Sequence, residues 1–210
     1  MTAHTLQIWG RINSINVRKV AWAAQECGVP FERTDAGMAF GIVKTPQYLA
    51  LNPNAKVPTL QDGELVLWES NVIVRYLCAK YGNDTLYPQD LEQRFDAERW
   101  MDWQQTTLNP ASGPAFHQLI RTPEPQRDPG LISKSVANME PLLEQLNSHL
   151  ARNAYFCGDH FSMADIPLGC EIHRWFGLPL ERPALPHLER WYAGVSSRPA
   201  TRGVLELPLT

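Results

Sequence analysis

The chain has few of the features that mark secreted, membrane-embedded or nucleic-acid-binding proteins. It carries no basic run and has a net charge of −3, so no nucleic-acid partner is expected. No apolar stretch approaches the ~20 residues that are needed to cross a bilayer, so no membrane contact is expected either. Its first residues, Met1, Thr2, Ala3 and His4, lack the basic and then apolar layout of a signal peptide. These absences predict a cytoplasmic protein.

Cysteine is also scarce, and its spacing fits neither a metal site nor a redox motif. The four cysteines are Cys27, Cys78, Cys157 and Cys170. None belongs to a Cys-x-x-Cys pair, and none has the close histidine spacing of a zinc site. We therefore expect no metal, and we favour buried structural thiols over reactive ones at all four positions.

The chain is rich in core-forming residues. Hydrophobic residues make up 44% of the 210 positions and include seven tryptophans, which is enough for one large core or two small ones. The first part alternates between strand and helix patterns. The expected strands are 6–9, 31–34 and two that flank the Asp62-Gly63 turn, and the expected helices are 16–27, 46–51 and 69–81. This order is βαβαββα, which predicts an α/β, thioredoxin-like domain over residues 1–82.

The second part of the chain has helical patterns only. Turn signals at residues 83–89 predict a linker. Residues 90–118 form a long, tryptophan-rich helical pattern that we expect to be interrupted near Pro110 and at Gly113-Pro114. The remaining segments are a loop expected over 121–130 and helices expected at about 132–150, 163–175 and 185–196. The sequence therefore predicts an all-helical C-terminal domain over residues 90–210.

The Val57-Pro58 pair stands where a strand should begin. Pro58 has no N–H, so it fits only at a strand start or edge, and it holds Val57 in an extended conformation. The backbone groups of Val57 would then be open to pair with an extended peptide by strand addition. A cis bond at this pair would make a fixed tight turn, since cis bonds are nearly confined to X–Pro.

Glu69 and Ser70 open the helix that follows the second strand of this hairpin. They place a carboxylate and the N–H groups of a helix start in position for an amino-acid-like end group. An ordinary first helical turn is the alternative interpretation. Together with Val57-Pro58, this pair predicts a site for a small peptide that carries its own amine and carboxylate.

This combination resembles the glutathione transferase family, in particular its bacterial serine-type, theta-like members. The matching residues are Asn52-Pro53, Val57-Pro58, Glu69-Ser70, Ile73, Tyr76-Leu77 and the downstream segment 158–165. The resemblance spans nearly the whole chain. It implies glutathione as co-substrate and a two-fold homodimer.

The turn over residues 10–16 leads into the first helix, whose N-terminus favours an anion. In the resembling family this turn holds the residue that stabilises the glutathione thiolate. Ser14 lies three residues before Val17-Arg18, which is the spacing of the serine-type members, so Ser14 is the first candidate, with Asn16 and Asn13 as alternatives. Ionising a thiol of pKa about 8.5 at neutral pH requires roughly 2–3 kcal/mol of preferential stabilisation. Simple helix capping is the other interpretation of these polar residues. Arg18 could add to the positive field at this turn, but a helix-surface arginine is more often solvated.

The resemblance also assigns contacts with the tripeptide. Val57, ahead of Pro58, would pair backbone to backbone with the cysteinyl unit. Glu69 would accept hydrogen bonds from the γ-glutamyl amine, and Ser70 would donate to its carboxylate. Lys56 would offer a charge to a carboxylate, and Lys44 is a further candidate for the glycyl end. A solvated side chain is the alternative for either lysine.

The helical part should supply the pocket for the second substrate. Trp103, Thr107 and Phe116 lie on the long helical stretch that would face the thiol. An apolar, aromatic wall suits a small hydrophobic electrophile. Core packing or dimer contacts are the alternative for each residue.

Ser162 and Asp165 could be mistaken for a catalytic pair. Their Ser-x-x-Asp spacing is that of a capping box, with Phe161 and Ile166 placed as a hydrophobic staple. We expect a structural role for this pair.

The leading hypothesis is therefore a glutathione S-transferase that activates the thiol of glutathione for attack on a hydrophobic electrophile. A second hypothesis is another glutathione-dependent enzyme on the same fold, such as an isomerase, dehalogenase or disulfide reductase. Residues 10–16 contain no cysteine, which argues against the disulfide chemistry of family members that place a nucleophile there. A third hypothesis is a non-catalytic interaction module.

Overall fold

The computed structural model describes residues 5–210 of the chain. Its internal contacts divide the chain into two compact units. Residues up to Tyr87, together with Pro199–Leu207, form the first unit, and Pro88–Arg198, together with Pro208–Thr210, form the second. None of the helices in the described part is long and apolar enough to cross a membrane.

A four-stranded mixed sheet is the centre of the first unit. The strands are β1 (Leu6–Trp9), β2 (Phe31–Thr34), β3 (Thr59–Asp62) and β4 (Leu65–Trp68), in the order β2-β1-β3-β4. The β1–β2 pair is parallel, and the other two pairs are antiparallel. Leu6 and Ile8 alternate into the core from β1, as expected for a period of two. All four predicted strands are confirmed.

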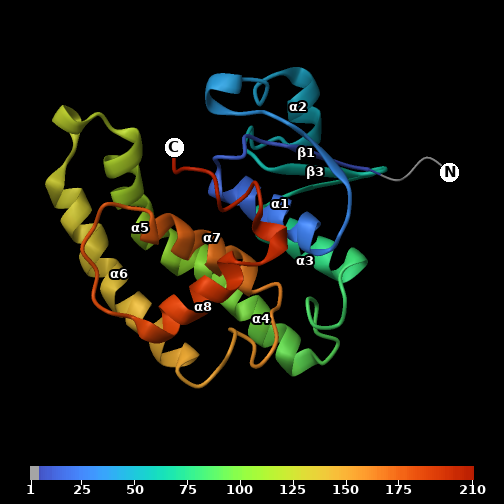
Figure 1. The fold of residues 1–210 in the computed structure, drawn as a ribbon. Helices are drawn as coiled ribbons and strands as arrows, with labels where there is room; N and C mark the ends of the chain where they lie inside the picture. Colours follow the sequence, from blue (N-terminus) through green and yellow to red (C-terminus); the bar gives the residue numbers. More distant parts are fainter. Residues whose placement is uncertain (1–4) are drawn as a thin grey trace. The chain divides into compact units, whose positions relative to one another are not determined.

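Helices cover both faces of this sheet (Figure 1). On one face, α1 (Ile15–Glu26) packs against α3 (Ser70–Tyr81), and the short α2 (Pro46–Leu51) lies on the other. A 3₁₀ turn, η1 (Met38–Phe40), precedes α2, and another, η5 (Pro199–Thr201), packs against α1. The observed order confirms the predicted βαβαββα, thioredoxin-like fold.

Helices form the regular structure of the second unit (Figure 1). They are α4 (Leu91–Trp103), α5 (Asn109–Phe116), α6 (Pro129–Leu150), α7 (Asp165–Phe176) and α8 (Pro186–Ser196), with short turns η2 (Gln104–Leu108), η3 (His117–Arg121) and η4 (Glu124–Gln126). The long α6 packs against both α5 and α8. The predicted helical C-terminal fold is confirmed.

The expected break near Pro110 and Gly113-Pro114 is wrong. Helical structure continues from α4 to the end of η3, with both prolines inside α5. Each proline lacks the N–H of a regular helical bond, but π-helical turns, η2 and η3, lie on either side of α5. A π turn shifts the backbone bonding by one residue, and this irregular pattern accommodates the prolines without ending the helix.

The helix expected from about residue 132 begins three residues earlier, at Pro129. Asp128 is its N-cap, and its side chain accepts hydrogen bonds from the backbone N–H groups of Gly130 and Leu131 at 2.8 and 3.2 Å. An Asp followed by Pro is a known helix-start signal. The loop that was expected over residues 121–130 therefore ends at Asp128, before the first residue of α6.

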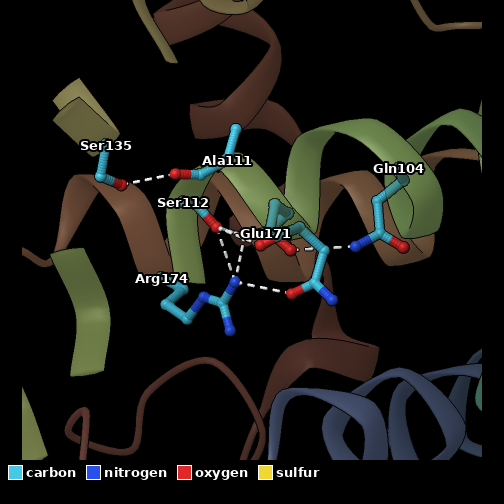
Figure 2. Close-up of polar contacts among 7 residues, drawn as sticks. Gln104, Ala111, Ser112, Ser135, Glu171 and Arg174 are labelled. Atoms are coloured by element: carbon cyan, nitrogen blue, oxygen red, sulfur yellow. Dashed lines mark hydrogen bonds and ion pairs between the residues drawn. The ribbon is translucent and has the colours of Figure 1, made fainter. Parts of the chain in front are cut away.

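A buried polar cluster ties several helices of the second unit together (Figure 2). Glu171 of α7 is fully buried, and it accepts hydrogen bonds from Gln104, Ser112 and Arg174. Arg174 also donates to Asn109 at 2.8 Å. Because buried charges are tolerated only when paired and hydrogen-bonded, this cluster is best explained as part of the helical core.

Candidate active site

The first turn places Ser14 at the start of α1. Gly10 follows β1 with φ +147°, and a Cβ at this position would lie 2.4 Å from Val17 Cγ2, so only glycine fits. The Ser14 N–H donates to the Arg11 carbonyl at 3.1 Å, which closes the turn. Ser14 is the N-cap residue and is buried, with 8% exposure, yet its hydroxyl makes no cap hydrogen bond. Side-chain capping, the other interpretation of Ser14, is therefore not observed.

The starts of α1 and α3 are joined by a side-chain hydrogen bond. Ser70 Oγ donates to Asn16 Oδ1 at 3.2 Å. This contact brings the predicted thiolate site and the predicted γ-glutamyl site together, although 54 positions separate the two residues. Because the Ser70 hydroxyl donates to Asn16, the remaining donors at this end of α3 include the N–H groups of its first turn.

Glu69 has an unusual backbone conformation. It precedes α3 with φ +72°, in a region that non-glycine residues rarely adopt and that costs on the order of 1–3 kcal/mol. Its side chain makes no cap hydrogen bond to the helix and is exposed. Strained residues of this kind cluster at binding sites, and here the strained residue carries an exposed carboxylate. No sequence pattern signals this conformation.

Side-chain hydrogen bonds from Tyr48 and Asn52 fix the segment before β3. The Val57–Pro58 bond is cis. Tyr48 Oη and Asn52 Nδ2 donate to the Lys56 carbonyl at 2.6 and 3.0 Å. Both side chains also contact Thr59 Oγ1, at 2.8 and 3.0 Å. Asn52 and Thr59 are buried, so this network fixes the backbone on either side of the cis bond.

Three segments meet beside Val57. A Cβ placed on Gly10 would lie 3.1 Å from Val57 Cβ. A Cβ placed on Gly37, just after β2, would lie 3.6 Å from Val57 Cγ1 and 3.3 Å from Arg11 Nη1. The two glycines therefore allow the first turn, the end of β2 and the segment before β3 to approach closely, and they place the Arg11 guanidinium at their junction.

Arg18 does not lie on a solvated surface as expected. It is 3% exposed, and its guanidinium donates to the carbonyls of Ile12 and Leu207 at 3.1 Å each. It thus fixes the first turn to the segment that follows η5. Arg18 is a structural residue, and Arg11 is the arginine that the sequence-based interpretation missed.

The other predicted contacts of the tripeptide stay predictions. Lys44 and Lys56 are both exposed, Lys44 just before α2 and Lys56 just before the cis bond. Their ammonium groups are accessible to a ligand carboxylate. Asn13 lies half-buried in the first turn, next to Ser14, and remains an alternative to it.

In the second unit, the three predicted pocket residues have different surroundings. Trp103 lines a hollow of about 340 Å³ with Arg99, Trp100 and Gln145. Phe116 is buried, and its ring centroid lies 4.8 and 5.0 Å from the guanidinium carbons of Arg121 and Arg174. Thr107 is half-buried in η2. The packing of Phe116 favours a core role for that residue, whereas Trp103 is accessible from a hollow.

The Ser162–Asp165 pair is structural, as predicted. Asp165 accepts hydrogen bonds from the Ser162 N–H and hydroxyl at 2.9 and 3.2 Å. Its other oxygen accepts from Phe156 N and Trp191 Nε1 at 3.2 and 2.8 Å. Complete burial raises the pKa of Asp165 to about 6, and these hydrogen bonds oppose that rise. The pair fastens the start of α7 to its neighbours.

The cysteines and acidic groups add no second candidate site. Cys78 and Cys170 are buried as expected, whereas Cys27 and Cys157 are only half-buried. Burial nevertheless raises the pKa of the Cys157 thiol to about 12, which makes it unreactive at neutral pH. Over residues 5–210, no group of three or more His, Cys, Asp or Glu side chains is arranged to hold a metal ion.

Comparison with known proteins places the chain in a family. It matches the N-terminal domain of glutathione S-transferases over residues 4–79 and their C-terminal domain over residues 127–194. It is 41% identical to glutathione S-transferase GstB of Escherichia coli strain K12, over 98% of this chain and 100% of that protein. It is 32% identical to glutathione S-transferase 3 of Zea mays, over 97% and 95% of the two chains.

A solved structure is also closely similar. It is the theta class glutathione S-transferase from Xanthomonas axonopodis pv. citri with glutathione bound, with a TM-score of 0.95 and 48% identity over 99% of this chain and 100% of that one. Fold and matches thus define a two-domain protein with a thioredoxin-like N-terminal and a helical C-terminal domain. The chain belongs to the glutathione S-transferase family.

Proposed function

We propose that this protein is a glutathione S-transferase that binds glutathione in its first unit and activates the thiol for attack on a hydrophobic electrophile. The observation that carries the proposal is the junction of the first turn, the cis Val57–Pro58 segment and the start of α3, which gathers Ser14, Val57 and Ser70 from distant parts of the chain. The similar structure that holds glutathione supports the choice of ligand.

The tripeptide lies extended along the Val57 segment. Its cysteinyl main chain pairs with the backbone of Val57 by strand addition. The exposed Glu69 carboxylate accepts hydrogen bonds from the γ-glutamyl amine. The backbone N–H groups at the start of α3, including that of Ser70, bind the adjacent carboxylate. Lys56 and Lys44 offer charge to the glycyl carboxylate. The hydrogen bonds from Tyr48 and Asn52 to the Lys56 carbonyl support this binding mode, because they pre-organise the backbone that the ligand must pair with.

The sulfur lies at the first turn. There the Ser14 hydroxyl, which makes no cap hydrogen bond, donates to the thiolate, and the partial positive charge at the start of α1 favours the same anion. Asn16 and Asn13 are the alternative donors. The thiolate then attacks an electrophilic carbon, so that an S–C bond forms and the leaving group departs with its electron pair. Catalysis rests on nucleophile activation and proximity. Trp103, which borders a hollow of the second unit, is the proposed contact for the apolar part of the electrophile.

The test is a Ser14→Ala variant assayed with glutathione and a model aryl halide. We expect folded Ser14→Ala to bind glutathione in calorimetry with little change in affinity but to conjugate the aryl halide much more slowly. Wild-type turnover by the folded variant would show that Ser14 is not the donor. Absence of glutathione binding by the wild-type protein would contradict the proposed function as a whole.

We further propose a cytoplasmic homodimer. Each unit exposes large apolar side chains, and exposed apolar patches commonly mark a contact surface for another protein. Trp68 and Val72 of the first unit are 40% and 44% exposed, and Leu91 and Phe95, one turn apart on α4, are 60% and 63% exposed. Sedimentation of the wild-type protein should give a dimer, and a Leu91→Lys, Phe95→Glu double variant should sediment as a monomer; a wild-type monomer would contradict the proposal.

A further inference from the structure

Three arginines surround the first turn, and two of them have clear structural partners. Arg18 donates to the carbonyls of Ile12 and Leu207. Arg33 donates to the Gly10 carbonyl at 2.7 Å and forms an ion pair with Asp35. Both guanidinium groups therefore hold backbone in place, and the charge of Arg33 is compensated.

The third arginine, Arg11, has a different environment. Its backbone is fixed, because its N–H donates to the Ala36 carbonyl at 3.2 Å and its carbonyl accepts from the Ser14 N–H. Its guanidinium lies beside Gly37, because a Cβ placed on that glycine would lie 3.3 Å from Arg11 Nη1. There its Nε is buried and has no hydrogen-bond partner among residues 5–210.

A buried donor without a partner is costly, and more so when it belongs to a charged group. Burial lowers the pKa of Arg11, but an arginine stays protonated at neutral pH. The position thus holds a full positive charge with incomplete hydrogen bonding, in the same turn as Ser14. An anionic ligand group would supply both the acceptor and the opposite charge.

We propose that Arg11 is a second catalytic residue, whose guanidinium pairs with the glutathione thiolate at the first turn. This inference rests on the proposed function, which sets the cysteinyl unit at Val57 and the sulfur at Ser14. Arg11 and Val57 have Gly37 as a common neighbour, and Arg11 shares a turn with Ser14. The two glutathione carboxylates have other proposed partners, at the start of α3 and at Lys44 and Lys56.

Other charges near this point do not replace Arg11. Arg33 is paired with Asp35, and Arg18 is directed at two carbonyls. Lys56 and Glu69 are exposed, so solvent screens them. Arg11 is therefore the arginine of this turn whose guanidinium retains a buried N–H, at Nε, for an anionic ligand group.

The test measures the pKa of the enzyme-bound thiol from its thiolate absorbance in wild-type protein and in Arg11→Gln and Arg11→Lys variants. It is run with glutathione and with γ-glutamylcysteine, which lacks the glycyl carboxylate. Arg202→Gln is the matched control, because Arg202 is exposed in the same unit. Thermal denaturation verifies that each variant is folded.

We expect Arg11→Gln to raise the bound thiol pKa by about one unit with both thiols, which is a tenfold loss of thiolate at a pH below that pKa. The acid limb of the pH profile of kcat/KM should move upward by the same amount, so that raising the pH restores activity. Arg11→Lys should retain most of the wild-type value because it keeps the charge, and Arg202→Gln should match wild type.

Two results would overturn the assignment. If Arg11→Gln weakens binding of glutathione but not of γ-glutamylcysteine and leaves the thiol pKa unchanged, Arg11 binds the glycyl carboxylate. If neither binding nor the thiol pKa changes, Arg11 is a structural or solvated arginine. Failure of the wild-type protein to bind either thiol is a separate outcome, which would remove the proposed function and this inference together.

Discussion

Two helices of this chain have a buried serine within three residues before their first residue, and the two serines are used differently. Ser162, ahead of α7, and its neighbour Asp165 form a closed set of hydrogen bonds that reaches Phe156 and Trp191. Ser14, ahead of α1, is buried to a similar degree but makes no cap hydrogen bond with its hydroxyl. We call the start of α7 closed, because its polar side chains pair with one another and stabilise the fold. We call the start of α1 open, because the Ser14 hydroxyl makes no cap hydrogen bond and can serve a ligand.

The largest effect is expected at the closed helix start. Asp165→Ala removes the acceptor of four buried donor groups, and leaving them unpaired should lower the free energy of unfolding by about 4 kcal/mol. Urea titration of the purified variant measures this loss. Conjugation activity per folded molecule should stay near that of wild type. A variant as stable as wild type would show that the network does not hold α7.

The open helix start should give the opposite result. Ser14→Ala should lower kcat/KM by about 100-fold, or about 2–3 kcal/mol, because a hydrogen bond to a charged group is lost in the transition state. Its free energy of unfolding should stay within about 0.5 kcal/mol of wild type, because no cap hydrogen bond is lost. Steady-state kinetics and urea titration on one preparation measure both quantities. A large loss of stability with unchanged kcat/KM would reverse the roles of the two serines.

Asp165, at the closed start of α7, should also make the free energy of unfolding depend on pH. The pKa of Asp165 is about 6 in the folded protein, above its ordinary value of 3.8. Its contribution is therefore fully favourable below pH 3.8 and is lost as the pH rises through 6. Between pH 5 and 7 this loss should amount to about 1–2 kcal/mol.

Urea titrations at these two pH values isolate the effect when wild type is compared with Asp165→Asn, which does not titrate. The asparagine variant should be less stable at both pH values, since its amide cannot accept all four hydrogen bonds. The difference between the two proteins should nevertheless be larger at pH 5 than at pH 7. An equal difference at both pH values would contradict the raised pKa of Asp165.

The smallest effect is expected for Ser162→Ala. The hydroxyl donates to Asp165 and accepts from the Ala164 N–H at 3.3 Å, while the backbone N–H of Ser162 keeps its bond to Asp165. Loss of a single capping hydroxyl should cost about 1 kcal/mol. Differential scanning calorimetry measures the change, and kcat/KM serves as the control that should not move. A drop in kcat/KM without a change in melting temperature would place Ser162 in the function of the protein.

Most of the fold could be predicted from the sequence because its signals are local. Leu6 and Ile8 alternate along β1, and Thr45 followed by Pro46 marks the start of α2. The prolines of α5 were misjudged for the converse reason. Whether a proline ends a helix depends on the bonding of the turns around it, and the π turns that accommodate Pro110 and Pro114 leave no pattern in the sequence.

The residues of the candidate site could be predicted only where their type and spacing in the sequence indicate a role. Ser14, Val57-Pro58 and Glu69-Ser70 are visible in the sequence, but the positive φ of Glu69 is not. The environments of Arg18 and Arg11 could not be predicted because distant contacts set them. Arg18 donates to a carbonyl 189 positions away, and the Arg11 guanidinium lies beside Gly37. Neither contact has a local signature.

A crystal of the wild-type protein soaked in glutathione is the most direct test of where the tripeptide binds. The ligand should lie extended with its cysteinyl main chain paired to the backbone of Val57, its γ-glutamyl end at Glu69 and Ser70, and its sulfur within hydrogen-bond distance of Ser14. A groove left empty at saturating ligand, or glutathione bound away from the first turn, would contradict the proposed site.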